Sequence, residues 1–177
     1  MGGGFKAGRD GRVSIRLDHG EVAILRSLVA QILDLVGPGS AGSDDPLERA
    51  LGIGAAEVTP PTDPVLARLF PAAYADEKEA LEFRRYTEPS LRDGKRADAE
   101  VVLRTAVPGK IELDAEQATA WLRALNDVRL ALGTRLEVTE EVHEQIERMS
   151  EDDERYAAFV TYDWLTYLQD SLVRALW

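Results

Sequence analysis

The chain has 177 residues, of which 45% are hydrophobic and 30% are charged, and its formal net charge at pH 7 is −11. It contains no cysteine, which excludes disulfides, thiolate metal sites and direct thiol redox chemistry. Residues 111–177 carry 15 acidic and 6 basic side chains, and a surface of this sign makes direct DNA binding unfavourable because it repels phosphate backbones.

The N-terminal part is predicted to form a β-hairpin followed by a long helix. The hairpin spans residues 5–17, because Asp10 and Gly11 are a common pair in tight turns and alternating residues follow them. Asp18 and Glu21 then form a capping-box pattern. This pattern predicts a helix that continues to the next Gly-Pro pair.

The middle of the chain is predicted to contain four helices. Two short helices cover residues 47–51 and 64–70. A longer helix covers residues 76–87, and Pro89 is predicted to interrupt it because proline cannot donate a backbone hydrogen bond. The fourth helix is predicted over residues 90–106.

The clearest helix of the sequence is a central one over residues 114–133. Asp114 and Gln117 match a capping box, and the apolar residues that follow are spaced one, three or four apart. This spacing places them on one face of the helix. Gly133 is predicted to end the helix in the left-handed conformation.

Short strands are predicted on both sides of the central helix, at residues 111–113 and 136–138. They pair either with each other or with the N-terminal hairpin. A helix over residues 139–149, with Thr139 as its N-cap, and a final helix from the region of residues 150–154 nearly to Trp177 complete the chain. Apolar and aromatic side chains surround much of the final helix, which predicts a core position or an oligomer interface, such as a homodimer contact.

The predicted fold class is mainly α. We expect a compact, helical bundle-like domain with a small N-terminal β-hairpin and short strands flanking the central helix. We expect a single domain over residues 1–177, with a disordered N-terminus at 1–4 and a flexible loop at 37–45. No apolar run is long enough to span a bilayer and no signal peptide is recognisable, so a cytoplasmic protein is expected.

A possible metal site is suggested by Glu140 and His143, which lie one helical turn apart, as in carboxylate proteins that bind iron. Such proteins need two of these pairs, and the only other histidine is His19. A solvated acidic helix face is therefore the favoured interpretation, and no metal or cofactor is predicted. Phosphate-binding glycine loops and serine nucleophile signatures are not found either, so no catalytic residue and no enzyme activity are predicted.

A basic run could form a positive surface on this acidic chain. It comprises Arg84, Arg85, Arg92, Lys95 and Arg96. One interpretation is a docking surface for an acidic protein segment or for nucleic acid. The other is internal salt bridging, because acidic residues are interleaved with the cations.

The predicted partner-binding surface combines four of these cations with polar residues of the central helix. Its members are Arg84, Arg85, Arg92, Arg96, Asn126, Asp127 and Arg129. Asn126 and Asp127 are unusual as an adjacent polar pair inside a helix. The simplest explanation is a local hydrogen bond, or a salt bridge to Arg123 or Arg129.

The alternative site is an aromatic-lined pocket for a small molecule. Trp121 of the central helix and Tyr162 and Trp164 of the final helix would line it. Core packing explains the same residues, because aromatic side chains dominate the burial of apolar area.

Several motifs are distributed along the chain. They read DPVL-x-RLFP at 63–71, EFRRYTE at 82–88, WLRALNDVRL-x-LG at 121–133 and YDWLTYLQ at 162–169. Together with the hairpin and the first helix, these motifs resemble an actinobacterial domain-of-unknown-function family that includes the oxidative-stress transcription regulator AosR. The resemblance covers nearly the whole chain, and the LNDVRL-x-LG part of the third motif is its most specific portion.

The resemblance implies a non-enzymatic regulatory or adaptor protein that acts through protein–protein contacts in a transcriptional stress response. A sigma factor or RNA polymerase is the partner that it implies. Redox sensing in the studied member is attributed to a pair of cysteines, which this chain does not have. Another signal must drive it, or it is a constitutive adaptor. The alternatives are a small-molecule sensor and a protein with a purely structural or interaction role.

Overall fold

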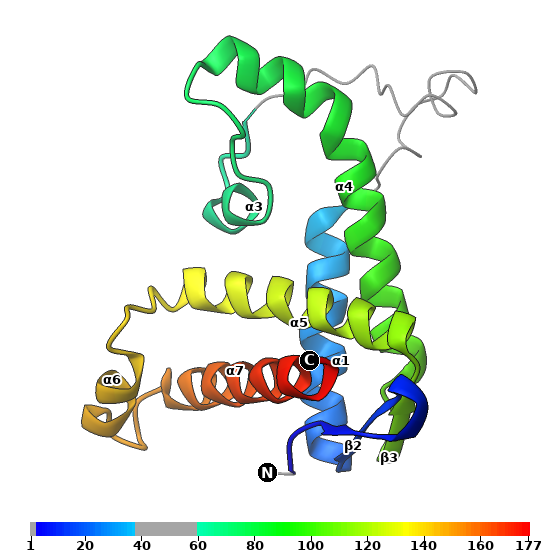
Figure 1. The fold of residues 1–177 in the computed structure, drawn as a ribbon. Coiled ribbons are helices and arrows are strands. Elements are labelled where there is room, and N and C mark those ends of the chain that lie inside the picture. The colour runs from blue at the N-terminus through cyan, green and yellow to red at the C-terminus, as the bar shows by residue number, and fades with distance from the viewer. Residues whose placement is uncertain (1–2, 38–59) are drawn as a thin grey trace.

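The computed structural model describes residues 3–37 and 60–177 and is mainly helical (Figure 1). In this part of the chain the helices are α1 His19–Val36, α3 Pro64–Leu69, α4 Glu77–Thr105, α5 Ala115–Arg135, α6 Val142–Arg148 and α7 Tyr156–Leu176. The strands are β1 Lys6–Ala7, β2 Val13–Leu17 and β3 Gly109–Leu113, with a 3-10 turn, η1, at Arg9–Gly11. The predicted helix at 47–51 and residues 38–45 of the predicted flexible loop lie outside the described residues.

The three strands form one antiparallel sheet in the order β1-β2-β3. Ile15 of β2 lies opposite Ile111 of β3, so the strand predicted before the central helix pairs with the hairpin. Asp10 and Gly11 both have positive φ, as the tight turn requires. The prediction of a strand at residues 136–138 is wrong, because α5 continues to Arg135 and a turn follows it.

The four long helices of the described residues are arranged in two pairs that cross each other. α1 and α4 run side by side in opposite directions, and α5 and α7 lie together across them (Figure 1). Arg26 in the middle of α1 donates from its guanidinium to the carbonyls of Leu103 and Ala106, where α4 ends. These carbonyls have no partner inside their own helix, so Arg26 fixes the end of α4 against α1.

Local capping signals in the sequence correctly predicted where two helices begin. Asp18 and Glu21 form a reciprocal capping box at the start of α1, and Asp114 and Gln117 form another at the start of α5. Gly37 follows α1 with a φ of 65°, which confirms the predicted stop.

Pro89 does not interrupt a helix, contrary to the prediction. It lies inside α4, which is one continuous helix of 29 residues and bends along its length (Figure 1). Proline removes one hydrogen bond from the helix and favours such a bend. Glu88, described below, bonds to residues on both sides of the proline and thereby holds the two parts together.

Gly133 does not end α5 either. The helix continues to Arg135, and Glu137 takes the left-handed conformation with a φ of 53°. A Cβ at Gly133 would lie 2.9 Å from Cε2 of Tyr162 on α7. The glycine therefore allows α7 to approach α5 closely, which is a tertiary role that the sequence signal did not distinguish from capping.

The last two helices begin later than predicted. α6 starts at Val142, and Thr139 instead accepts a hydrogen bond from the backbone N–H of Glu141 at 3.3 Å. α7 starts at Tyr156 after a series of turns. These residues are mostly exposed, so local turn chemistry rather than core packing determines the boundaries.

The hydrophobic core lies where the sheet, α1, α4, α5 and α7 meet. Trp121 is completely buried there, packs edge-on against Phe5 with ring centroids 5.7 Å apart, and donates its indole N–H to Thr105. The N-terminal segment is attached to the same core, because the backbone N–H of Gly4 donates to the hydroxyl of Tyr167. Residues 1–2 lie outside the described part, and the disorder predicted for residues 1–4 stays a prediction.

Candidate functional site

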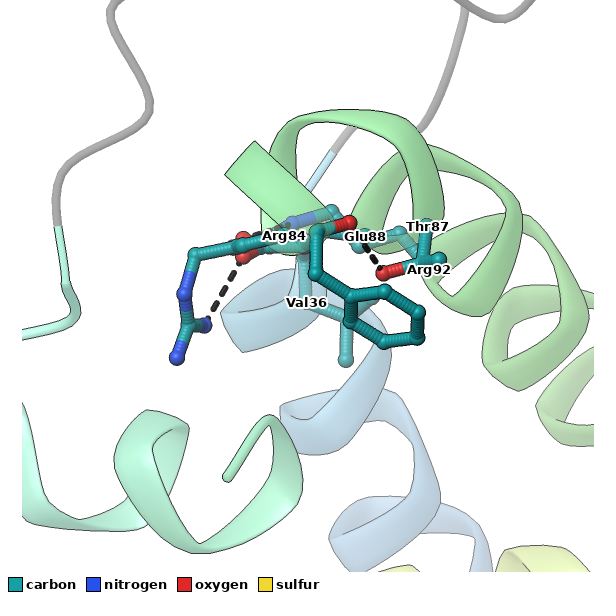
Figure 2. Close-up of polar contacts among 6 residues, drawn as sticks. Val36, Arg84, Thr87, Glu88 and Arg92 are labelled. Atoms are coloured by element: carbon teal, nitrogen blue, oxygen red, sulfur yellow. Dashed lines mark hydrogen bonds and ion pairs between the residues drawn. The ribbon is translucent and has the colours of Figure 1, made fainter. Parts of the chain in front are cut away.

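The side of α4 that faces α1 and α3 carries most of the basic run, and Glu88 organises it. Its carboxylate accepts from Arg84 at 2.9 Å, one turn earlier in the helix, and from Arg92 at 2.7 Å, one turn later (Figure 2). Arg84 is only 9% exposed. The guanidinium of Arg84 therefore lies in the interior and its charge is neutralised there.

The next cations of the run bond to the C-terminal end of α1. Arg92 also donates to the backbone carbonyl of Val36, and Arg96 donates to the carbonyl of Gly37 at 2.8 Å. The end of a helix carries partial negative charge and unpaired carbonyls, so two guanidinium groups stabilise it. Arg92 and Arg96 thus help to fix α1 against α4.

Phe70, at the end of α3, lies beneath two cations of α4. The guanidinium of Arg92 is 4.6 Å from the centre of the phenyl ring, and the ammonium of Lys95 is 5.7 Å from it. Phe70 itself is buried. These cation–π contacts attach α3 to α4 without an ion pair.

Arg85 differs from the other predicted arginines. It is exposed, and within the described ranges no ion pair or hydrogen bond of its side chain is seen. Salt bridging and helix capping therefore account for Arg84, Arg92 and Arg96. A docking role remains a prediction, and Arg85 is the arginine of the basic run to which it can still apply.

Asp127 and Lys95 form a largely buried ion pair between α5 and α4. Lys95 Nζ on α4 lies 2.7 Å from Asp127 Oδ1 on α5, and Asp127 is only 4% exposed. Burial raises the pKa of the Asp127 carboxyl, and the bond to Lys95 opposes that rise. The predicted local partner of Asp127 is thus wrong, because the cation comes from another helix.

Asn126 likewise finds its partner on another helix. Its side-chain oxygen accepts from the amide of Gln169 on α7 at 3.3 Å. The other amide atom, Gln169 Oε1, is buried and has no hydrogen-bond partner, and the same is true of Arg129 Nε. Two buried polar atoms without partners mark this part of the molecule as unusual, because such atoms are costly.

A groove opens above these polar residues, between α4, α5 and α7. It has a volume of about 610 Å³, and we call it the α4–α5–α7 groove. It is lined by Ser90, Leu91, Gly94, Lys95, Asp98, Leu122, Arg123, Asn126, Asp127, Gln169, Val173 and Trp177. Two members of the predicted partner surface, Asn126 and Asp127, lie in this groove. Arg129 lines a neighbouring pocket beside His143 and Asp163 instead.

Asp98 is a second carboxylate of the groove. Arg123 lies 3.9 Å from it, but the Arg123 side chain is 67% exposed whereas that of Asp98 is 15% exposed. Burial raises the pKa of Asp98, Arg123 opposes the rise, and the nearby Asp127 adds to it. The charge of Asp98 is therefore poorly balanced.

The three aromatic residues that were predicted to line a pocket lie away from the groove. Trp121 and Trp164 are 0% and 4% exposed and belong to the core, and Tyr162 lies against Gly133. None of the three rings lines the groove. The two tryptophans therefore do what the core-packing interpretation expects, whereas a ligand role for the three rings remains only a prediction.

Glu140 and His143 do not form a larger cluster of metal-binding side chains. Glu140 precedes α6, and His143 Nδ1 lies 3.4 Å from Asp163 Oδ1 at the exposed surface. In the part of the chain that the structure describes, no group of three or more His, Cys, Asp or Glu side chains is placed to hold a metal ion. None of the described helices has the length and apolar character that crossing a membrane requires.

Several groove residues were not predicted, and one of them had a signal in the sequence. Leu91, Asp98, Gln169, Val173 and Trp177 come from two helices that only the tertiary fold brings together. Gly94 lies inside a predicted helix, where glycine is unfavourable relative to alanine. A glycine at such a position is a reason to look for a functional or packing constraint.

Comparison with known proteins identifies relatives along nearly the entire chain. A Mycobacterium leprae protein, a candidate oxidative stress regulator AosR, is 37% identical over 173 residues, covering 88% of this chain and 78% of that protein. The oxidative stress regulators AosR of Mycobacterium bovis and Mycobacterium tuberculosis are each 35% identical over 187 residues, covering 95% of this chain and 84% of each relative. No solved structure matches the chain. The family described as "Domain of unknown function (DUF2017)" matches residues 2–176, and the chain belongs to this family.

Proposed function

We propose that the protein is a non-enzymatic regulator of a transcriptional stress response that acts by binding a protein partner. The observation that carries this proposal is the similarity to oxidative stress regulators, which extends over 95% of the chain. A coarser statement, a regulatory role in stress response, follows from that similarity alone. The protein contact is the step that we add.

Electrostatics supports a protein rather than DNA as the partner. The net charge of −11 opposes binding to a phosphate backbone. Three arginines of the basic run, Arg84, Arg92 and Arg96, are bonded to groups within the molecule and are not available as a row of phosphate contacts. We propose a sigma factor or RNA polymerase in the cytoplasm as the partner.

The signal cannot be oxidation of cysteine thiols in this chain, because it has none. The protein therefore works as a constitutive adaptor or answers to another signal. A redox-sensitive thiol on the partner is compatible with the first of these.

Affinity capture with the tagged 177-residue chain in a lysate of its native organism tests the proposal. We expect mass spectrometry to identify a sigma factor or RNA polymerase subunits, and we expect the purified pair to bind directly. Arg85→Glu reverses the one exposed arginine of the predicted surface, and Arg135→Glu, an exposed residue at the end of α5, is the matched control. Capture of no transcription protein, together with specific DNA binding by the purified chain, would contradict the proposal.

A further inference from the structure

Several apolar side chains at the rim of the α4–α5–α7 groove are exposed to solvent. Trp177 is 87% exposed, Leu91 is 51% exposed and Val173 is 39% exposed. Single exposed apolar residues are common on protein surfaces, but these three line one groove. Adjacent exposed apolar groups around a concave surface are typical of a binding site.

Gly94 keeps one wall of this groove open. A Cβ at Gly94 would meet no atom within 4 Å, and its backbone is that of the α4 helix. Neither packing nor backbone conformation among the described residues therefore requires a glycine here. Glycine in the interior of a helix is less favourable than alanine, and at this position it leaves the groove accessible.

The polar floor of the groove contains one acceptor without a partner and one carboxylate that the neighbouring cations balance only in part, although Lys95 and Arg123 also line it. Gln169 Oε1 is buried and has no hydrogen-bond partner. The ammonium of Lys95 lies 2.7 Å from Asp127, and its Coulombic attraction lowers the pKa of Asp98 less than that of Arg123 does. The ion pair that Asp98 does form is a long one, 3.9 Å, with the exposed guanidinium of Arg123. The floor thus matches a ligand group that is positively charged and donates hydrogen bonds.

We propose that the α4–α5–α7 groove binds a helical segment of the partner protein that carries a lysine or arginine among apolar residues. This inference rests on the proposed function and names the surface and the chemistry of the partner. The apolar residues would pack on Leu91 and Val173, as in other helix-in-groove complexes. The cation would reach Asp98 and Gln169, and Trp177 offers an aromatic face beside it.

The test uses three defined peptides and the complete chain. Each peptide is a labelled, alanine- and leucine-rich helix of roughly 15 residues, long enough to form a helix on binding. The peptides differ only at the central position, which is lysine, glutamate or norleucine. Binding is measured by fluorescence anisotropy and located by chemical-shift changes at Gly94, Gln169 and Trp177.

We expect the lysine peptide to bind at least about tenfold more tightly than the glutamate peptide, because a hydrogen bond to a charged group typically produces a difference of this size. Norleucine should bind with intermediate affinity. Asp98→Asn should reduce the preference for lysine over glutamate. Asp152→Asn removes the same charge from the exposed turn before α7 and should leave the preference unchanged.

The variant Gly94→Leu distinguishes a loss of binding from a loss of folding, because it should affect only binding. Leucine favours a helix and finds open space at this position, so the variant should unfold at an equal or higher urea concentration than the native chain. It should nevertheless lose at least about tenfold in affinity for the lysine peptide, because its side chain occupies the groove.

Three results would overturn the inference: no binding of any peptide, equal binding of the lysine and glutamate peptides, or unchanged binding by a folded Gly94→Leu variant. Affinity capture with Gly94→Leu separates the two proposals. A transcription partner that Gly94→Leu still captures would refute the groove and leave the proposed function intact. Binding of the lysine peptide in the groove, without capture of a transcription protein by the native chain, would refute the proposed function alone.

Discussion

The two sides of α4 differ in how completely their charged and polar groups are paired. On the side that faces α1 and α3, Arg84, Arg92 and Arg96 all bond to acceptors inside the molecule. On the side that faces α5 and α7, Lys95 pairs with Asp127, but the ion pair of Asp98 with Arg123 is long, 3.9 Å, and Gln169 Oε1 has no partner. A run of charged residues that stands out in a sequence can thus be paired entirely with groups inside the fold. The other side of the same helix, which does not stand out in the sequence, can still be available for binding.

Substitutions on the side of α4 that faces α1 and α3 should reduce the stability of the fold most. Glu88→Ala should lower the free energy of unfolding by about 2 kcal/mol, because it leaves Arg84 buried without its carboxylate, although partial exposure of the pair reduces the loss. Urea denaturation monitored by circular dichroism measures the change. Glu100→Ala, an exposed position of the same helix, is the control and should change stability by less than about 0.5 kcal/mol. Equal effects of the two substitutions would show that Glu88 does not organise this side.

The two helix glycines should respond in opposite directions. Gly133→Ala places a Cβ against Tyr162 and should lower the free energy of unfolding by about 1 kcal/mol, because overpacking outweighs the gain in helix propensity. Gly94→Ala meets no neighbour and should raise it by about 0.5–1 kcal/mol. Thermal and urea unfolding of both variants check the signs. A destabilised Gly94→Ala would mean that the groove is closed in solution.

The smallest expected effect is the pH dependence of folding stability that Asp98, in the α4–α5–α7 groove, produces. The pKa of Asp98 is raised above its ordinary value of 3.8, mainly by burial, so the protonated carboxyl is favoured in the folded protein. Its contribution to stability is therefore present below the unfolded pKa of 3.8 and is lost as the pH rises through the higher folded pKa. Asp98→Asn imitates the protonated form. It should be more stable than the native chain at neutral pH, and this advantage should disappear in acid. An advantage that grows as the pH falls would contradict the assignment.

Signals that depend only on neighbouring residues predicted the fold well. The capping boxes at Asp18 and Asp114 and the turn at Asp10 were all confirmed, because each is completed within a few residues. Pro89 and Gly133 were misinterpreted for the converse reason. Their effect on a helix depends on Glu88 and its two arginines and on Tyr162, which lies on another helix.

The groove could be predicted only in fragments. Asn126 and Asp127 were recognised as unusual in the sequence, but their partners are Gln169 and Lys95 on two other helices. The separation between residues 95, 127 and 169 is too large for any helix periodicity to relate them. Gly94 was the one local signal, and it indicates an open position without saying which residues surround it.

The arginines at the two ends of the α1–α4 contact also determine how those helices can move. Arg26 of α1 bonds to the end of α4, while Arg92 and Arg96 of α4 bond to the end of α1. Sliding one helix along the other by a single turn, about 5.4 Å, would break both sets of bonds together. The pair therefore resists sliding, and the rearrangements that remain open to it are a tilt or a rotation in which the two helices keep their register.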